Sequence, residues 1–266
     1  MFELQYVVIG IIQGLTEFLP ISSSAHLVII SAATDWEDQG IFTDIAVHVG
    51  TLGAVIIYLF KDIKKIFIDF FTFKKNYFIN NHHYGLKIIL ATLPAILIGF
   101  FVYEYFLIYF RSLIVIGWAC IIFGCILFFA DYVSSSNKKW EELKAWEIFV
   151  IGCFQVLSFI PGASRAGVTI SGARFLNVKR DSAAIFSMLL SIPIILASLI
   201  LSFINVISSD SFVKIDLYQP MIASIISFIT AFFSIHFMMK VLKFTNFNIF
   251  IIYRLMLGIA LLLIYG

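Results

Sequence analysis

The chain has 266 residues, of which 61% are hydrophobic and 13% are charged. Soluble domains carry roughly 25% charged residues, so the composition excludes a soluble helical protein and indicates an integral membrane protein. The net charge of +2 is too small to suggest binding to nucleic acid. An acidic residue stands near the start, where a secretory signal needs basic ones, so we expect no cleaved signal peptide.

Six stretches have the length of about 20 apolar residues that spans a bilayer as a helix. They lie near residues 45–60, 86–103, 113–130, 183–206, 220–241 and 247–265. Two further apolar stretches, 4–31 and 145–176, are each interrupted by a cluster rich in proline and serine. Irregular backbone at membrane depth is tolerated only inside protein or along a wet cavity. The sequence therefore predicts an all-α polytopic membrane protein with about six spanning helices and two re-entrant helix–loop–helix hairpins.

The two interrupted stretches resemble each other. Residues 13–26 read QGLTEFLPISSSAH, and residues 155–169 read QVLSFIPGASRAGVT. Their leading glutamines lie 142 positions apart, and so do two of the serines that follow the prolines. We interpret the chain as a single membrane domain, 1–266, made of repeat 1 at about 1–130 and repeat 2 at about 145–266.

Basic residues gather in alternate loops, and cytoplasmic loops carry an excess of lysine and arginine. Thirteen of the 18 basic residues lie in segments 61–87, 138–144, 179–180 and 240–243, whereas the loop 34–44 is purely acidic. The loops alternate correctly only if neither hairpin crosses the membrane. We therefore expect an inverted-topology repeat whose hairpins enter from opposite sides and meet near the midplane, with both termini external.

Glu17 and His26 are the ionisable residues of the first cluster. A membrane-embedded carboxylate costs several kcal/mol unless it is paired or wet, so Glu17 is a candidate general base or metal ligand. The alternative is a structural partner for Arg165. Ser23 and His26 are spaced i, i+3, and a histidine beside a hydroxyl can accept its proton and make it a nucleophile. Ser22 is a candidate phosphate ligand, although capping a helix is an equal alternative.

The second cluster has the chemistry of an anion site. Gly162 lets the backbone approach a ligand closely, and free N–H groups at the start of a half-helix favour an anion. Arg165 adds a planar fork of donors that matches phosphate oxygens, and Ser164 and Thr169 can donate further. With the first cluster, this is the equipment for phosphoryl transfer, in which positioning and charge stabilisation dominate.

Other polar residues lie close enough in sequence to support such a site. The candidates for this supporting role are Gln13, Asp44, His48, Gln155 and Arg174. Arg174 could reach a phosphate, but snorkelling of its charge to the membrane interface is an alternative. Arg254 also lies in an apolar stretch, and the sequence suggests no partner for it.

With these two polar clusters, the chain resembles the undecaprenyl-diphosphate phosphatase family of the bacitracin-resistance type. Residues 13–17 resemble the family's (Glu/Gln)-x-x-x-Glu motif, and residues 161–169 resemble its Pro-Gly-x-Ser-Arg-x-x-x-Thr motif. Segments 42–55 and 186–193 match further family blocks, so the resemblance covers essentially the whole chain.

The resemblance implies a phosphoric anhydride hydrolase that cleaves a C55 polyprenyl diphosphate into the monophosphate and inorganic phosphate. It implies a divalent cation, Mg²⁺ or Ca²⁺, and a multi-pass protein of the bacterial plasma (inner) membrane whose site opens to the external, periplasmic side. It also implies recycling of the lipid carrier for peptidoglycan synthesis and resistance to bacitracin.

The resemblance assigns catalytic roles to Glu17, Ser23, His26 and Arg165. Ser23 matches the proposed nucleophile, and Arg165 matches the phosphate-binding arginine. Two residues depart from the pattern: Gln13 replaces a glutamate of some members, which removes one metal ligand, and Ala166 replaces a frequent serine. Attack by Ser23 with His26 as base and direct attack by water both fit the sequence.

Two alternative functions and one possible assembly also follow from the sequence. A translocase, or flippase, for a lipid phosphate or small anion would share the inverted repeat and the broken helices, but it would not explain the serine and histidine beside Glu17. A scaffold for cell-wall enzymes would need no buried ionisable groups. The small residues Gly117, Ala119 and Gly124 would allow the close helix contact of a homodimer.

Overall fold

The computed structural model describes residues 2–34, 36, 40–71, 83–105, 112–208 and 217–266. The α-helices are α1 (Phe2–Thr16), α2 (Ser23–Ala33), α3 (Gly40–Tyr58), α4 (Phe60–Phe71), α5 (Tyr84–Tyr105), α6 (Leu113–Val133), α7 (Ala145–Val156), α8 (Arg165–Phe175), α9 (Arg180–Ser208), α10 (Tyr218–Phe244) and α11 (Asn248–Tyr265). Two short 3₁₀ helices, η2 (Trp140–Glu142) and η3 (Leu157–Phe159), flank α7. These helices confirm the predicted all-α membrane fold.

Five helices in the described part of the chain are long and apolar enough to cross a membrane, namely α3, α6, α9, α10 and α11. The sixth predicted span, 86–103, lies within α5, which has 22 residues. One helix was not predicted: α4 lies in the basic segment 61–87. Its apolar residues recur at helical spacing, and Ile63 and Ile66 pack against the core. Its lysines are exposed, whereas Asp69 is buried and accepts a hydrogen bond from the Tyr84 N–H at 2.7 Å.

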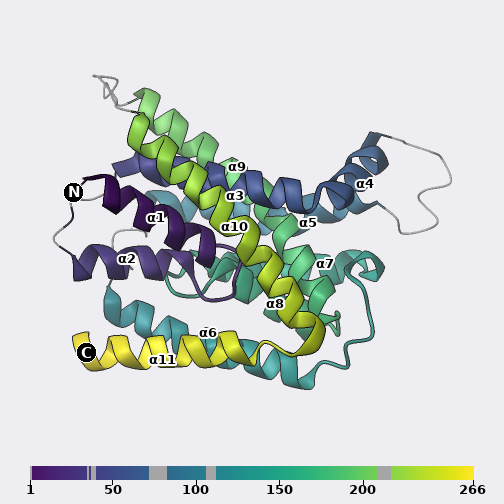
Figure 1. The fold of residues 1–266 in the computed structure, drawn as a ribbon. Coiled ribbons are helices and arrows are strands. Elements are labelled where there is room, and N and C mark those ends of the chain that lie inside the picture. The colour runs from purple at the N-terminus through teal and green to yellow at the C-terminus, as the bar shows by residue number, and fades with distance from the viewer. Residues whose placement is uncertain (1, 35, 37–39, 72–82, 106–111, 209–216) are drawn as a thin grey trace.

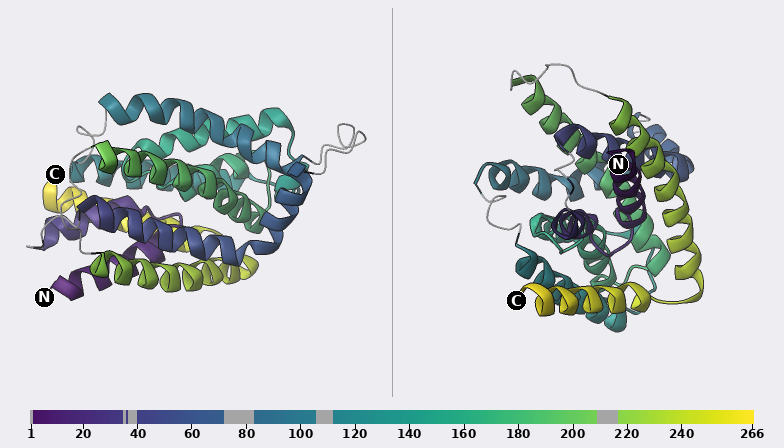
Figure 2. Two further views of the ribbon diagram at one scale, coloured as in Figure 1. Left: turned by 90° about the horizontal axis from the view of Figure 1, so that it is seen from above. Right: turned by 60° about the vertical axis from the view of Figure 1, so that its left-hand side comes forward.

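Two pairs of short helices form the predicted hairpins. α1 with α2 and α7 with α8 are each broken at a proline, and none of the four exceeds 15 residues, so none can span a bilayer alone. Figures 1 and 2 show α1 and α2 at the end of the bundle that holds both termini, and α7 and α8 toward the opposite end. The division into repeats at about 1–130 and 145–266 stays a prediction.

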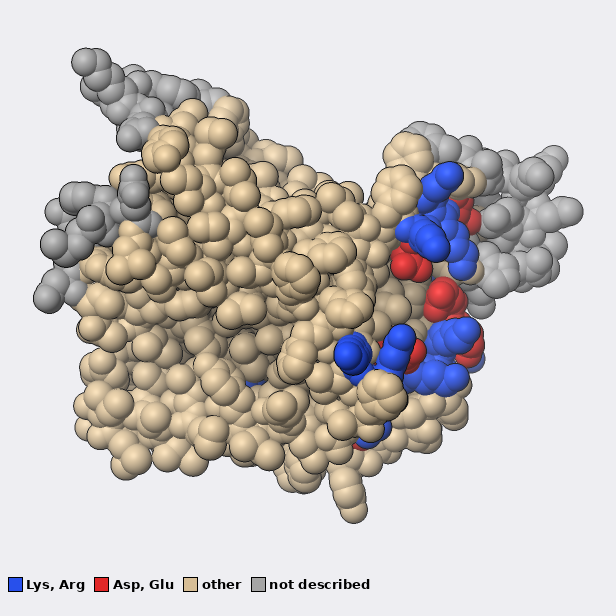
Figure 3. Space-filling model, in the orientation of Figure 1, with Lys and Arg blue, Asp and Glu red and all other residues tan. Residues whose placement is uncertain are grey.

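Charged side chains separate along the bundle. On the face in Figure 3, the described Lys, Arg, Asp and Glu gather at the end near α4, whereas both termini lie at the other end in Figure 1. Most of the remaining described surface in Figure 3 carries none of these charged residues, and many exposed side chains of the long helices are large hydrophobics, as expected for a protein whose solvent is lipid.

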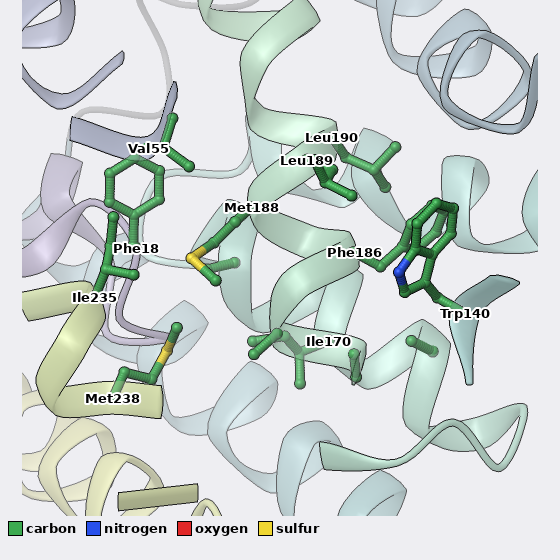
Figure 4. Close-up of a cluster of buried hydrophobic side chains, with 14 of the residues drawn as sticks. Phe18, Val55, Trp140, Ile170, Phe186, Met188, Leu189, Leu190, Ile235 and Met238 are labelled. Carbon is green, nitrogen blue, oxygen red and sulfur yellow. The ribbon is translucent and has the colours of Figure 1, made fainter. Parts of the chain in front are cut away.

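The main core lies between the two hairpins and the long helices around them. Figure 4 shows Phe186 on α9 next to Trp140, and these rings stack with centroids 5.3 Å apart. At the opposite side of the view, Phe18 lies near Val55 and Ile235. Phe18 is 1% exposed and directly follows Glu17 in sequence, so core packing anchors the first hairpin at the position of its carboxylate.

The small residues that suggested a homodimer surface pack within the chain. A Cβ at Gly258 on α11 would lie 2.7 Å from the Gly117 carbonyl oxygen, so α6 and α11 approach closely. Gly124 on α6 faces Leu255 on α11, and Ala119 lies against the turn at Gly162. Gly117, Ala119 and Gly124 are all buried against other parts of the same chain, and the homodimer stays a prediction.

Candidate active site

An ion pair joins the two hairpins. Arg165, the first residue of α8, donates from Nη2 to Oε1 of Glu17, which follows α1, at 2.9 Å. The two side chains are only 11% and 9% exposed. Desolvating either charge alone would cost several kcal/mol, so each requires the other. The arginine and carboxylate of the two sequence clusters thus form one composite site.

The remaining contacts of this pair fix its orientation. Ser23 Oγ donates to Glu17 Oε2 at 2.7 Å, and Gln13 Nε2 donates to the same oxygen at 3.0 Å. Arg165 Nη1 donates to the Ser187 carbonyl oxygen at 3.0 Å. Glu17 therefore accepts three hydrogen bonds from side chains, a set suited to a carboxylate that stays ionised.

Matching serines shape the turns before the inner half-helices. Ser22 and Ser164 have φ of +73° and +69°, which non-glycine residues rarely adopt. Each serine caps the helix after it, because Ser22 Oγ accepts from the Ala25 N–H and Ser164 Oγ accepts from the Gly167 N–H. The caps offset part of the backbone strain and direct the first turns of α2 and α8 toward the same space.

That space is a cavity of about 310 Å³. Its polar wall includes Glu17, Ser22, Ser23, Ser24, Asp44, His48, Ser164 and Arg165. Its apolar wall includes Ile45, Phe159, Ile194, Ile195 and Leu199. The cavity can hold an anionic group beside the starts of two helices and an apolar chain along Ile194, Ile195 and Leu199 of α9, where Ser198 and Ser202 also line it.

His26 faces a different groove, so the expected pairing with Ser23 is not formed. His26 Nδ1 lies 2.7 Å from the Ser22 carbonyl oxygen and must donate to it, which leaves Nε2 of the neutral ring to accept from the Tyr253 hydroxyl at 2.5 Å. The two rings also stack at 5.6 Å. The i, i+3 spacing misled the prediction because Ser23 starts α2 and its hydroxyl turns back to Glu17.

The supporting residues fall into different places. Gln13 contacts Glu17 directly, and Asp44 and His48 line the cavity, with His48 Nδ1 2.7 Å from the Asp44 carbonyl oxygen. Gln155 is buried outside the cavity lining, and its amide atoms have no hydrogen-bond partner among the described residues.

Two predicted phosphate ligands also lie outside the cavity lining. Thr169 is 1% exposed, and its hydroxyl bonds the Arg165 carbonyl oxygen at 2.8 Å and the Ser187 hydroxyl at 2.7 Å. Thr169 therefore holds Ser187, whose carbonyl oxygen accepts a hydrogen bond from the Arg165 side chain. Gly162, at φ +92°, turns its carbonyl oxygen toward Arg254, which donates to it at 2.9 Å.

Arg174 does not take the supporting or snorkelling role predicted for it. Its fully buried guanidinium donates from Nε to Asp131 Oδ1 at 2.7 Å, and Arg180 shares that carboxylate at 2.9 Å. Further bonds go to the Ser136 hydroxyl and the Val178 carbonyl oxygen, both at 2.6 Å. The chain therefore uses Arg174 to fasten the outer end of α8 to α6.

Sequence reasoning missed Ser187, Tyr253 and the role of Arg254. The first two act through a backbone carbonyl and a single hydroxyl, for which no sequence pattern exists. A charge in an apolar stretch was the available signal for Arg254, because such residues in membrane proteins are usually functional.

The donor set bears on whether a metal fits. No group of three or more His, Cys, Asp and Glu side chains that could hold a metal occurs among the residues described. Two carboxylates, Glu17 and Asp44, do line the cavity. Magnesium is often held by one or two carboxylates together with substrate phosphates, so the residues fit a cation that is shared with a phosphorylated substrate.

Fold and site together define a polytopic membrane protein with a Glu17–Arg165 ion pair and a cavity between two broken-helix hairpins. A family model described as bacitracin resistance protein BacA matches residues 6–260. The chain belongs to this family.

Several curated relatives cover nearly the whole chain. Undecaprenyl-diphosphatase of Idiomarina loihiensis is 35% identical over 263 residues, 98% of each chain. Undecaprenyl-diphosphatase 2 of Stutzerimonas stutzeri is 38% identical over 267 residues, 99% of this chain and 98% of its own. Undecaprenyl-diphosphatase of a Jannaschia species is 39% identical over 262 residues, 96% of each.

Proposed function

We propose that this protein hydrolyses undecaprenyl diphosphate to undecaprenyl phosphate and inorganic phosphate. The observation that carries the proposal is the buried contact of Glu17 with both Arg165 and Ser23. It combines a nucleophile, a proton acceptor and a phosphate-binding cation in one cavity. The names of the full-length relatives support the same activity. The reaction would recycle the lipid carrier for peptidoglycan synthesis and, in abundance, confer resistance to bacitracin.

Substrate binding follows from the two walls of the cavity. The diphosphate lies at the polar wall, where Arg165 and the hydroxyls of Ser22 and Ser164 can donate to its oxygens. The first isoprene units lie along the apolar wall at Ile194 and Leu199. The rest of the C55 chain extends into the lipid, because the cavity of about 310 Å³ is too small for it.

The chemical step begins with the hydrogen bond from Ser23 Oγ to Glu17. The oxygen attacks the terminal phosphorus, its proton passes to Glu17, and the phosphoanhydride bond breaks to release undecaprenyl phosphate. Water then attacks the phosphorus of the phosphoserine, and the bond from phosphorus to Ser23 Oγ breaks. Ser23 Oγ takes its proton back from Glu17, and inorganic phosphate leaves with the oxygen and protons of the water. Arg165 stabilises the charge on the phosphoryl oxygens. In the alternative route Glu17 activates water directly.

His26 lies outside the cavity lining and stabilises the turn that carries Ser22. Its bonds to the Ser22 carbonyl oxygen and the Tyr253 hydroxyl connect the first turn of α2 to α11. Glu17 takes the role of base that the sequence suggested for His26, because Glu17 is the group that accepts the Ser23 hydrogen bond.

A divalent cation, Mg²⁺ or Ca²⁺, would be held by Glu17 and Asp44 together with the phosphates, and it would neutralise negative charge on them. Chelation should abolish phosphate release from the purified protein, and added Mg²⁺ should restore it. Undiminished release after chelation would contradict a required cation.

The transport alternative is not favoured, because the curated relatives carry the names of phosphatases. The buried Ser23–Glu17 contact also has no evident use in carrying an anion across the membrane.

Replacing Ser23 tests the covalent route. Ser23→Ala removes the attacking oxygen but retains the Glu17–Arg165 pair, so we expect turnover to fall by on the order of 10³-fold or more. Ser24→Ala is the matched control, because Ser24 lines the same cavity without contacting Glu17. Phosphate release from undecaprenyl diphosphate in detergent measures both variants. Near-normal turnover of Ser23→Ala would exclude the covalent route in favour of water.

The orientation in the membrane is a separate proposal. The basic end near α4 faces the cytoplasm of a bacterial inner membrane, and both termini face the periplasm, because basic loops stay inside. The site then opens to the periplasmic side. A reporter fused after Gly266 that is active only outside the cytoplasm should be active. A cytoplasmic signal from that fusion would reverse the orientation.

A further inference from the structure

Arg254 on α11 connects the broken turns of both hairpins. Its side chain is 0% exposed. Nη1 donates to the Pro20 carbonyl oxygen at 3.3 Å, and Nη2 donates to the carbonyl oxygens of Gly162 and Ala163, both at 2.9 Å. One guanidinium therefore binds backbone from two segments that are about 140 positions apart in sequence.

These carbonyls belong to breaks in helices, where backbone groups lose their intrahelical partners. In a membrane an unsatisfied carbonyl costs several kcal/mol, because no water replaces the lost bond. A planar guanidinium can serve several acceptors at once, whereas a lysine ammonium on a flexible stem cannot match this arrangement. The positive charge is also favourable beside the carbonyl ends of the preceding half-helices.

The same turns carry the reacting groups. Pro20 lies three positions before Ser23, and Gly162 lies three positions before Arg165. Ser23 and Arg165 line the cavity, whereas Arg254 is not among the residues that line it. Holding the two sets of carbonyls together therefore fixes where the nucleophile and the phosphate-binding arginine stand relative to each other.

We propose that Arg254 is a positioning residue for the hydrolysis, holding the tips of both hairpins in the geometry that the reaction requires. This role rests on the proposed function, since it concerns the alignment of Ser23 with Arg165. Arg254 acts through the backbone of the turns and does not touch the substrate.

Two observations set Arg254 apart from an ordinary buried arginine. Arg174 is also fully buried, but it pairs with Asp131, whereas Arg254 forms no ion pair among the residues described. A Cβ at Gly167 would lie 2.6 Å from Arg254 Nη1. The first turn of α8 thus leaves room for the guanidinium, and filling that room would displace it.

The first test compares Arg254→Met and Arg254→Lys with wild type, using phosphate release from undecaprenyl diphosphate by monodisperse protein in detergent. A misplacement of about 1 Å costs on the order of 100-fold in rate, so we expect kcat of Arg254→Met to fall by about that factor while KM changes only a few-fold. The kcat of Arg254→Lys should lie between those of wild type and Arg254→Met. Arg174→Met is the control: its thermal stability should fall, but kcat of its folded fraction should stay near wild type.

The second test keeps the arginine and moves it. Gly167→Ala should lower kcat on the order of tenfold, because a smaller displacement of the guanidinium still misaligns the turns. The same substitution made in Arg254→Met should cost much less, because the group that it displaces is already gone. This cycle also covers the case in which Arg254→Met yields no folded protein, since Gly167→Ala and Arg254→Lys then carry the comparison.

The outcomes separate the two proposals. A folded Arg254→Met or Arg254→Lys variant with wild-type kcat would overturn the positioning role and leave the phosphatase intact. Equal losses from Gly167→Ala with and without Arg254 would also overturn it. Absence of phosphate release from the folded wild-type chain, with its cation present, would overturn the proposed function itself.

Discussion

A carboxylate and a guanidinium buried within a lipid-facing bundle are the interaction on which the rest of this structure depends. Neither Glu17 nor Arg165 could remain charged alone at that depth, because desolvation would cost several kcal/mol for each. They lie on different hairpins and are 2.9 Å apart. Pairing them therefore requires the tips of both hairpins to meet, and that meeting creates the cavity.

The meeting point determines what surrounds it. Helices broken at membrane depth expose N–H groups on one side of each turn and carbonyl oxygens on the other. The N–H side, at Ser22 and Ser164, faces the cavity, where an anion can bind. The carbonyl side faces Arg254, which binds both turns. The long helix α9 then provides the apolar side chains along which a prenyl chain can lie.

Much of this arrangement could be predicted from sequence, because composition and prolines in apolar stretches report on the membrane directly. Glu17 and Arg165 were identifiable because a charge in lipid requires a partner. The mistaken pairing of Ser23 with His26 assumed that both side chains lie on one face of α2, whereas Ser23 turns back to Glu17 across the break. The partners of Arg254 are backbone carbonyls, which leave no mark in a sequence.

The central claim is that Glu17 and Arg165 act as one unit, and a double-variant cycle on phosphate release tests it most directly. Glu17→Gln, Arg165→Gln and the double variant would be assayed for kcat/KM on undecaprenyl diphosphate, with the folded fraction measured for each. If the two residues form one site, kcat/KM of each single variant should fall by about 100-fold or more. The kcat/KM of the double variant should then be close to that of the less active single variant. Losses that multiply in the double variant would show two independent contributions and contradict the account.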